Sequence, residues 1–116
     1  MTSAVYDIPV PPSLNNIYPT GKSGRRFLAP AAKLWATQAG WELKQQKARL
    51  IPGKVSVALT VRAPQRRTDI DGKIKAVLDL LVKQGVIEAD HDGIVRRVSA
   101  EWGDVPRARV EIRSVK

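Results

Sequence analysis

The sequence predicts a small α/β domain in which a mixed β-sheet packs against two main helices and finishes in a C-terminal antiparallel hairpin. Segments of alternating apolar and polar residues, typical of half-buried strands, occur in the order strand, helix, strand, helix, strand, strand. The two helical segments repeat apolar residues about every four positions, as helices that pack on one face do. Since there is no internal repeat or long linker, residues 1–116 are expected to form a single domain.

The first half of the chain contains one predicted strand and one predicted helix. The strand is expected at residues 6–10, where three nearby prolines stop it. Residues 13–28 are rich in Asn, Pro, Gly and Ser, which predicts a loop. Pro30 suits the first turn of a helix that runs to about Arg49. The expected buried stripe of this helix is Ala31, Trp35, Ala39 and Leu43.

The second half begins after a break at Pro52-Gly53, with a half-buried strand predicted at residues 55–61. A second helix is expected to begin between residues 69 and 71, with Thr68 or Asp69 as its cap, and to end at Gly85. A turn at residues 103–106 separates the last two strands. In the first of these, residues 94–102, one face is expected to carry Ile94, Arg96, Val98, Ala100 and Trp102.

The net charge of +9 is distributed unevenly. Residues 1–68 contain eleven Lys or Arg and two acids, whereas residues 69–116 contain nine of each, and six of the eleven acids lie between Asp69 and Asp92. A basic surface favours nucleic-acid binding; the alternative is a basic protein kept soluble by its charge. The acidic cluster favours the first interpretation, because acids within a phosphate-binding surface repel the ligand unless they hold a metal ion.

Composition excludes several classes of site. The chain has no cysteine, so it has no disulfide framework, cysteine nucleophile or thiolate zinc site. His91 is the one histidine, which excludes a multi-histidine metal site. No apolar run is long enough to span a bilayer, and residues 1–10 lack the features of a signal peptide. A cytoplasmic location is therefore expected.

The segment 66–75 contains several residues that are suited to binding a metal ion or a phosphate. Asp69 and Asp71 lie two positions apart at the predicted strand-to-helix junction, where an extended chain points both carboxylates to the same side. Such oxygen ligands select Mg²⁺, with Mn²⁺ as a substitute. Lys75 lies one helical turn after Asp71 and is suited to binding a phosphate or orienting water. The alternative is structural: helix-capping acids and a surface ion pair.

A second acidic group, Glu88, Asp90 and Asp92, surrounds His91 after the second helix. A returning loop would bring one of these acids beside the first pair, and three clustered carboxylates need a cation. Asp92-Gly93 favours a tight turn, and His91 is interpreted as a surface turn residue rather than a general base. These patterns leave the role of Asp90 open.

Three blocks of sequence resemble the RusA-type Holliday-junction resolvases. Residues 67–76, RTDIDGKIKA, are similar to the D-[LI]-D-N-x-x-K signature of that family. Residues 79–90 resemble its D-x-L…G…D-D segment, and residues 11–18, PPSLNNIY, resemble its P-P-S-x-N-x-x-Y opening. The blocks occur in the family's order over nearly the whole chain. The resemblance implies a homodimeric, Mg²⁺-dependent endonuclease that cleaves four-way DNA junctions.

The resemblance also implies roles for individual residues. Asp69, Asp71 and Asp90 match the metal-binding acids, and Lys75 matches the catalytic lysine, so these four residues are the expected catalytic set.

Two positions depart from the pattern. Gly72 replaces the usual asparagine, and Ala89 replaces the first of the paired acids, which leaves Asp92 as an alternative third ligand.

Phosphate contacts are expected from two basic groups, one in the predicted loop and one directly before the acids. They are Lys22, Arg25, Arg26, Arg66 and Arg67. Weaker candidates are Arg96, Arg97, Arg107 and Arg109. The three tryptophans are interpreted as core or dimer-interface residues. Two other functions remain alternatives: a non-catalytic junction- or RNA-binding module with structural carboxylates, and a small basic protein of a ribonucleoprotein.

Overall fold

The computed structural model describes residues 2–12, 30–63 and 70–115, without the side chains of residues 30, 71 and 72. The α/β class with a mixed sheet and two helices is confirmed, and the elements follow the predicted order. They are β1 (Ser3–Ile8), α2 (Pro30–Gln45), β2 (Val55–Arg62), α3 (Asp71–Lys83), β3 (Val95–Gly103) and β4 (Ala108–Ser114). β1 begins earlier than predicted, and α2 ends before Arg49.

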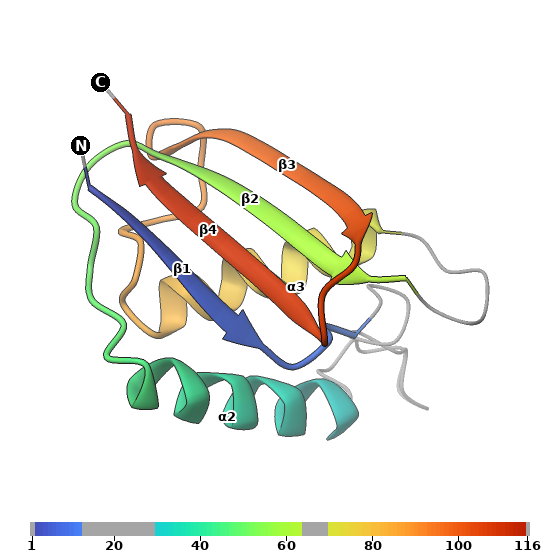
Figure 1. The fold of residues 1–116 in the computed structure, drawn as a ribbon. Coiled ribbons are helices and arrows are strands. Elements are labelled where there is room, and N and C mark those ends of the chain that lie inside the picture. The colour runs from blue at the N-terminus through green and yellow to red at the C-terminus, as the bar shows by residue number, and fades with distance from the viewer. Residues whose placement is uncertain (1, 13–29, 64–69, 116) are drawn as a thin grey trace, which may run out of the picture.

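The strands of the described ranges form one sheet in the order β1-β4-β2-β3. β2 and β3 are parallel, joined by a crossover through α3, while β4 is antiparallel to both β1 and β2. Both C-terminal strands belong to the sheet and run in opposite directions, but the expected hairpin pairing between them is corrected, because β2 lies between β3 and β4 (Figure 1).

Burial explains why β4 takes the central position. Ala108, Val110 and Ile112 of β4 are all 0% exposed, so this strand needs neighbours on both sides and helices above it. Most side chains of β3 are exposed or half-buried, as suits an edge strand. Alternation predicts that a segment is a strand, but it does not predict the neighbour with which the strand pairs.

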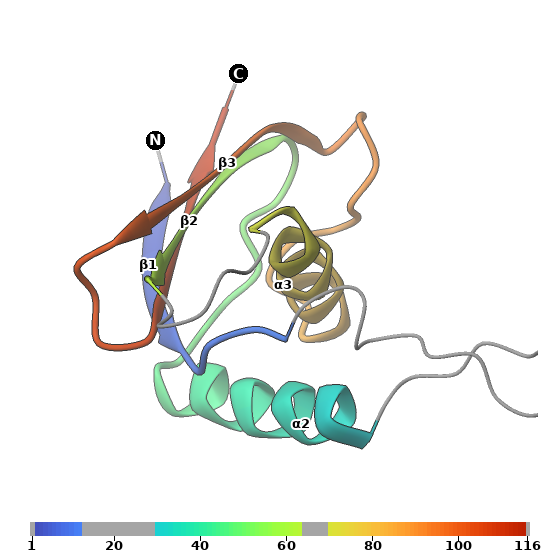
Figure 2. The same cartoon turned by 90° about the vertical axis from the view of Figure 1, so that its right-hand side faces the viewer.

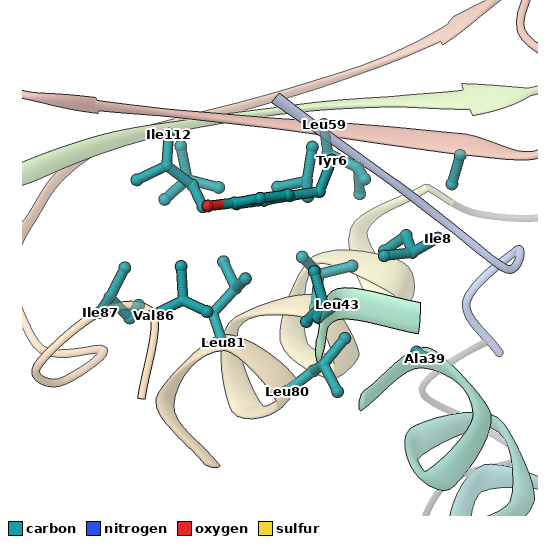
Figure 3. Packing of buried hydrophobic residues seen from close by; sticks show 14 of the residues in the cluster. Tyr6, Ile8, Ala39, Leu43, Leu59, Leu80, Leu81, Val86, Ile87 and Ile112 are labelled. Carbon is teal, nitrogen blue, oxygen red and sulfur yellow. The ribbon is translucent and has the colours of Figure 1, made fainter. Parts of the chain in front are cut away.

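The helices α2 and α3 lie on the same face of the sheet, and no described element covers the opposite face (Figure 2). The core therefore forms a single layer between sheet and helices (Figure 3). It includes Tyr6 and Ile8 from β1, the alternate residues of β2 and β4, and residues of both helices. From α3 and the segment after it come Val77, Leu80, Leu81, Val86 and Ile87.

The buried stripe of α2 differs by one position at its start from the prediction. Ala32 is 4% exposed and Ala39 and Leu43 are buried, but Ala31 is exposed. A spacing of exactly four residues drifts around a helix of 3.6 residues per turn, so the stripe moves from Ala31 to Ala32. Trp35 is half-buried, and its indole N–H donates to the carbonyl of Pro9 at 2.9 Å.

An ion network joins α2 to the sheet. The guanidinium of Arg107, in the turn before β4, donates to both carboxylate oxygens of Glu42 on α2 and to Asp7 on β1. The hydrogen bonds from Arg107 and then Gln38 hold the pKa of Glu42 below its ordinary value. The same two acids raise the pKa of Arg107 further above its already high value. In the described ranges, neither helix has the length and apolar character needed to cross a membrane.

Candidate active site

A lysine and two carboxylates meet on the solvent side of α3. The ammonium of Lys75 lies 3.0 Å from the Oδ1 atom of Asp79 and 3.6 Å from the Oδ2 atom of Asp90. Asp79 is one helical turn further along α3, whereas Asp90 comes from the loop between α3 and β3. The structure therefore brings together two of the four predicted catalytic residues, Lys75 and Asp90.

The apolar face of α3 determines where this cluster lies. Ala76, Val77, Leu80 and Leu81 are buried against the sheet, which leaves Lys75 and Asp79 on the side of the helix that faces solvent. About 49% of the Lys75 side chain and 41% of the Asp90 side chain are exposed, so both remain accessible to a large substrate.

The loop that carries Asp90 returns along α3 because of two local features. Gly85 has a φ of +71°, the left-handed conformation that ends many helices, and the backbone N–H of Val86 donates to Leu81. Val86 and Ile87 are then buried at 0% and 1% exposure, which anchors the chain before it turns back. The predicted helix end at Gly85 is thus confirmed in its physical role.

The charge state of Lys75 follows from its neighbours. The hydrogen bond to Asp79 raises the pKa of Lys75 most, burial opposes it as the next largest effect, and the negative charges of Asp79 and Asp90 raise the pKa further. Lys75 is therefore a cation at neutral pH. A charged ammonium stabilises a phosphate or its developing negative charge, but it cannot accept a proton.

Two charged residues of α3 were missed by the sequence analysis as site residues. Asp79 pairs with Lys75 at the i, i+4 helical spacing, which is a signal that sequence alone contains. Lys73 is 6% exposed, and its ammonium donates to the carbonyl of Pro11 at 2.5 Å. Burial lowers the pKa of Lys73. This contact attaches the first turn of α3 to the segment after β1, and no periodicity predicts it.

Asp92 and His91 make local backbone contacts within the loop. The Nδ1 atom of His91 accepts the backbone N–H of Gly93, and the His91 carbonyl accepts those of Ile94 and Val95. These bonds support its interpretation as a turn residue. The backbone carbonyl of Asp92 accepts a hydrogen bond from Arg96 at 2.8 Å, and the acid of this loop that lies beside Lys75 is Asp90.

Several predicted site residues lie outside the described residues. Asp71 is the first residue of α3, one turn before Lys75, but its side chain is not described, and Asp69 falls wholly outside. Within the described side chains, no three acidic or histidine groups converge. The predicted phosphate contacts also lie outside the described residues, in 13–29 or 64–69: Lys22, Arg25, Arg26, Arg66 and Arg67.

Comparison with known proteins defines the class of this molecule as an endodeoxyribonuclease. A family model described as "Endodeoxyribonuclease RusA" matches residues 8–113, which include every described strand and helix except β1 before Ile8 and the last residue of β4. The chain is also 40% identical over 86 residues to "Crossover junction endodeoxyribonuclease RusA" of Aquifex aeolicus (strain VF5), covering 72% of this chain and 67% of that protein. The chain therefore belongs to the RusA endodeoxyribonuclease family.

Proposed function

We propose that this endodeoxyribonuclease resolves four-way (Holliday) DNA junctions by paired, symmetric cleavage of phosphodiester bonds, in DNA recombination and repair. The name of the similar Aquifex protein, a crossover junction endodeoxyribonuclease, supports this substrate. The observation that carries the catalytic part is the contact between Lys75 of α3 and Asp90 of the following loop. Family membership argues against the alternative of a non-catalytic binding module.

In this proposal, Asp69, Asp71 and Asp90 hold Mg²⁺, with Mn²⁺ as a substitute. The proposed donors are all carboxylates, which are the hard oxygen ligands these ions prefer, and the exposed Asp90 carboxylate is open to solvent on the Lys75 side. When bound, the ion supplies charge neutralisation and lowers the pKa of a coordinated water. Asp90 is favoured over Asp92 as the third ligand because Asp90 is the acid of this loop that forms an ion pair with Lys75.

Lys75 binds the scissile phosphate through its ammonium and stabilises the negative charge that develops on the phosphoryl oxygens. Asp79 holds this ammonium in place from the same helix. Water attacks phosphorus, the bond to the 3′ oxygen breaks, and the products carry a 5′-phosphate and a 3′-hydroxyl. Lys22, Arg25, Arg26, Arg66 and Arg67 contact the DNA backbone and orient the junction.

A homodimer completes the proposal, because a two-fold assembly matches a nearly symmetric junction and gives each like strand its own site. Dimerisation is inferred from the family resemblance.

The test compares a labelled four-way junction with a linear duplex of the same sequence, in Mg²⁺ and in EDTA. We expect paired nicks on the junction alone, and none in EDTA. Asp69→Asn with Asp71→Asn should abolish cleavage while junction binding persists or tightens, because repulsion between the acids and the phosphates falls. Matched Glu101→Gln removes an exposed acid of β3 and should leave cleavage intact. Junction binding without cleavage in either Mg²⁺ or Mn²⁺ would overturn the proposed function.

A further inference from the structure

The uncovered face of the sheet carries a row of arginine and serine side chains at one end. Ser3 of β1 is opposite Arg113 of β4, Arg113 is opposite Ser56 of β2, and Ser56 is opposite Arg97 of β3. Neighbouring side chains of one strand point to opposite faces, and the flanking residues of β2 and β4, Val55, Val57 and Ile112, are buried under the helices. The row therefore faces away from α2 and α3, at the sheet end near both labelled termini (Figure 1).

A bulge in β3 puts Arg97 into this row. Val55 is opposite Val95, but the next residue of β2, Ser56, is opposite Arg97 rather than Arg96. The extra residue, Arg96, donates to the carbonyl of Asp92 and leaves the ladder. Beyond the bulge the expected alternation holds, with Arg97 on the face opposite to Val98, whereas Val95, which was expected to share the face of Arg97, packs against the core instead. Bulges commonly re-aim side chains, and here the bulge directs Arg97 to the uncovered face.

The row forms the floor of a hollow with the composition of an anion site. Its volume is about 410 Å³, and none of the described residues that line it carries a carboxylate. The lining consists of two arginines, four hydroxyl residues and one valine: Thr2, Ser3, Ser56, Arg97, Arg113, Ser114 and Val115. Arg113 donates one bond to Glu111 at 3.2 Å, and 64% of its side chain is exposed. A guanidinium has five donors, so this single contact leaves Arg113 able to bind a phosphate.

We propose that Arg97, Arg113 and Ser56 form a second phosphate-binding site, which takes a backbone phosphate of the DNA substrate on the face of the sheet opposite Lys75. The two arginines flank Ser56 from the strands on either side of β2, roughly 9 to 10 Å apart at the backbone, and can close on one phosphate between them. The proposal rests on the proposed function, since it makes the ligand a part of the branched substrate.

The position of the site suggests which part of that substrate it contacts. Lys75 and Asp90 lie with α3 on the covered face, so one straight duplex cannot lie flat against both sites (Figure 2). A branched DNA has arms that diverge and can reach both faces. The arginine row therefore recognises a second arm of the junction and contributes to the preference for branched over linear DNA.

The chain offers a matched control on the same strand and face. Arg109 of β4 is exposed like Arg113, but it is opposite Asp7 of β1 and Thr60 of β2, and Thr60 is opposite Glu101. Arg109→Gln thus removes the same charge from the same face in an acidic setting. The experiment measures binding of Arg97→Gln, Arg113→Gln and Arg109→Gln to a labelled four-way junction and to linear duplex, in EDTA, from roughly 50 to 200 mM salt.

We expect Arg97→Gln and Arg113→Gln to weaken junction binding by about three- to tenfold and to reduce the slope of log affinity against log salt by about 0.9, the loss of one phosphate contact. Their binding of linear duplex and the junction binding of Arg109→Gln should match the parent protein. Equal effects of all three variants on the junction would overturn the site, because they would report net charge alone. A changed oligomeric state of the Arg97 or Arg113 variant, measured by light scattering, would also overturn it, because the row would then be a subunit contact.

Cleavage by the parent protein, assayed with the same junction in Mg²⁺, separates the two proposals. If the parent cleaves the junction and all variants bind alike, the second site fails and the proposed function stands. If the parent does not cleave but the arginine variants show the reduced slope of log affinity against log salt, the proposed function fails and phosphate binding by the row stands.

Discussion

At the scale of single residues, the site depends on a lysine that is held between two carboxylates. Asp79 binds the Lys75 ammonium at hydrogen-bond distance from the same helix, and Asp90 approaches it from the loop. The first contact fixes the side chain on the helix surface, while the second ties the position of the loop to it. Both pairs are exposed, so they contribute little to the free energy of unfolding. Their value lies in the position they give to one positive charge.

Lys75→Met should therefore reduce the single-turnover rate of junction cleavage on the order of 10²- to 10³-fold, the usual effect of losing one group that stabilises transition-state charge. The measurement is single-turnover cleavage at saturating protein. Lys83→Met removes an exposed lysine from the last turn of the same helix and should cleave like the parent protein. Equal losses in the two variants would mean that Lys75 acts through net charge and not at the reacting phosphate.

At the scale of secondary-structure elements, α2 is held to the sheet by polar contacts at its C-terminal half. Gln46 follows the helix and bonds the backbone of Asp7 twice, accepting its N–H at 2.9 Å and donating to its carbonyl at 2.7 Å. It thereby occupies the outer edge of β1, which would otherwise present unpaired backbone groups. Arg107 links Glu42 and Asp7 beside it. Helix, edge strand and the turn before β4 are thus connected at one place.

This network predicts an acid-sensitive element of stability. The folded-state pKa of Glu42 is lowered, so its stabilisation is present above the unfolded-state pKa of about 4.3 and is lost as pH falls through the lower folded-state value. Near neutral pH, Glu42→Gln should cost about 1 to 2 kcal/mol, a value reduced because 39% of the Arg107 side chain is exposed.

Urea denaturation over a pH series measures this difference. The gap between parent and Glu42→Gln should narrow progressively below about pH 4.3, because the unfolded parent then binds a proton at Glu42, and the gap closes once the folded parent is protonated as well. Glu101→Gln, at an exposed position of β3, should follow the parent at every pH. A gap that stays constant down to pH 3 would show that the Glu42 charge does not contribute.

At the scale of the whole molecule, the domain has one covered and one uncovered face, and its stability comes from the covered one. Ile112→Ala on β4 removes a 0% exposed side chain from the core and should lower the free energy of unfolding by about 2 to 5 kcal/mol. Val5 of β1 is 53% exposed on the uncovered face, so Val5→Ala should change the free energy of unfolding by less than about 0.5 kcal/mol. Thermal or urea unfolding of both variants tests whether the covered face contributes most of the stability.

The sequence predicts much of this architecture, because periodicity reports which face of a segment is buried. Strand β2 and helix α3 follow their patterns closely, and Gly85 correctly predicts the end of α3. Alternation of apolar and polar residues does not predict which strands are neighbours. The central position of β4 and the bulge before Arg97 were therefore found only in the structure.

The candidate site divides in the same way. Spacing within one helix relates Asp71, Lys75 and Asp79, whereas the approach of Asp90 depends on how the loop folds back, and the family resemblance was needed to anticipate it. Lys73 is buried, although lysine side chains are usually exposed to water. Its contact with Pro11, which is distant in the sequence, cannot be predicted from a local pattern.

The central place of β4 has a consequence for how the chain acquires its structure during synthesis. β1 pairs residues 3–8 with residues 108–113, so the first strand made must wait for the last before the sheet can close. Long-range pairings of this kind raise the contact order and slow folding. A nascent chain that has reached residue 107 exposes the core-facing sides of β1 and β2 with a gap between them, which is a state prone to aggregation. The candidate site around Lys75 therefore belongs to a domain whose sheet closes only after residue 113 leaves the ribosome.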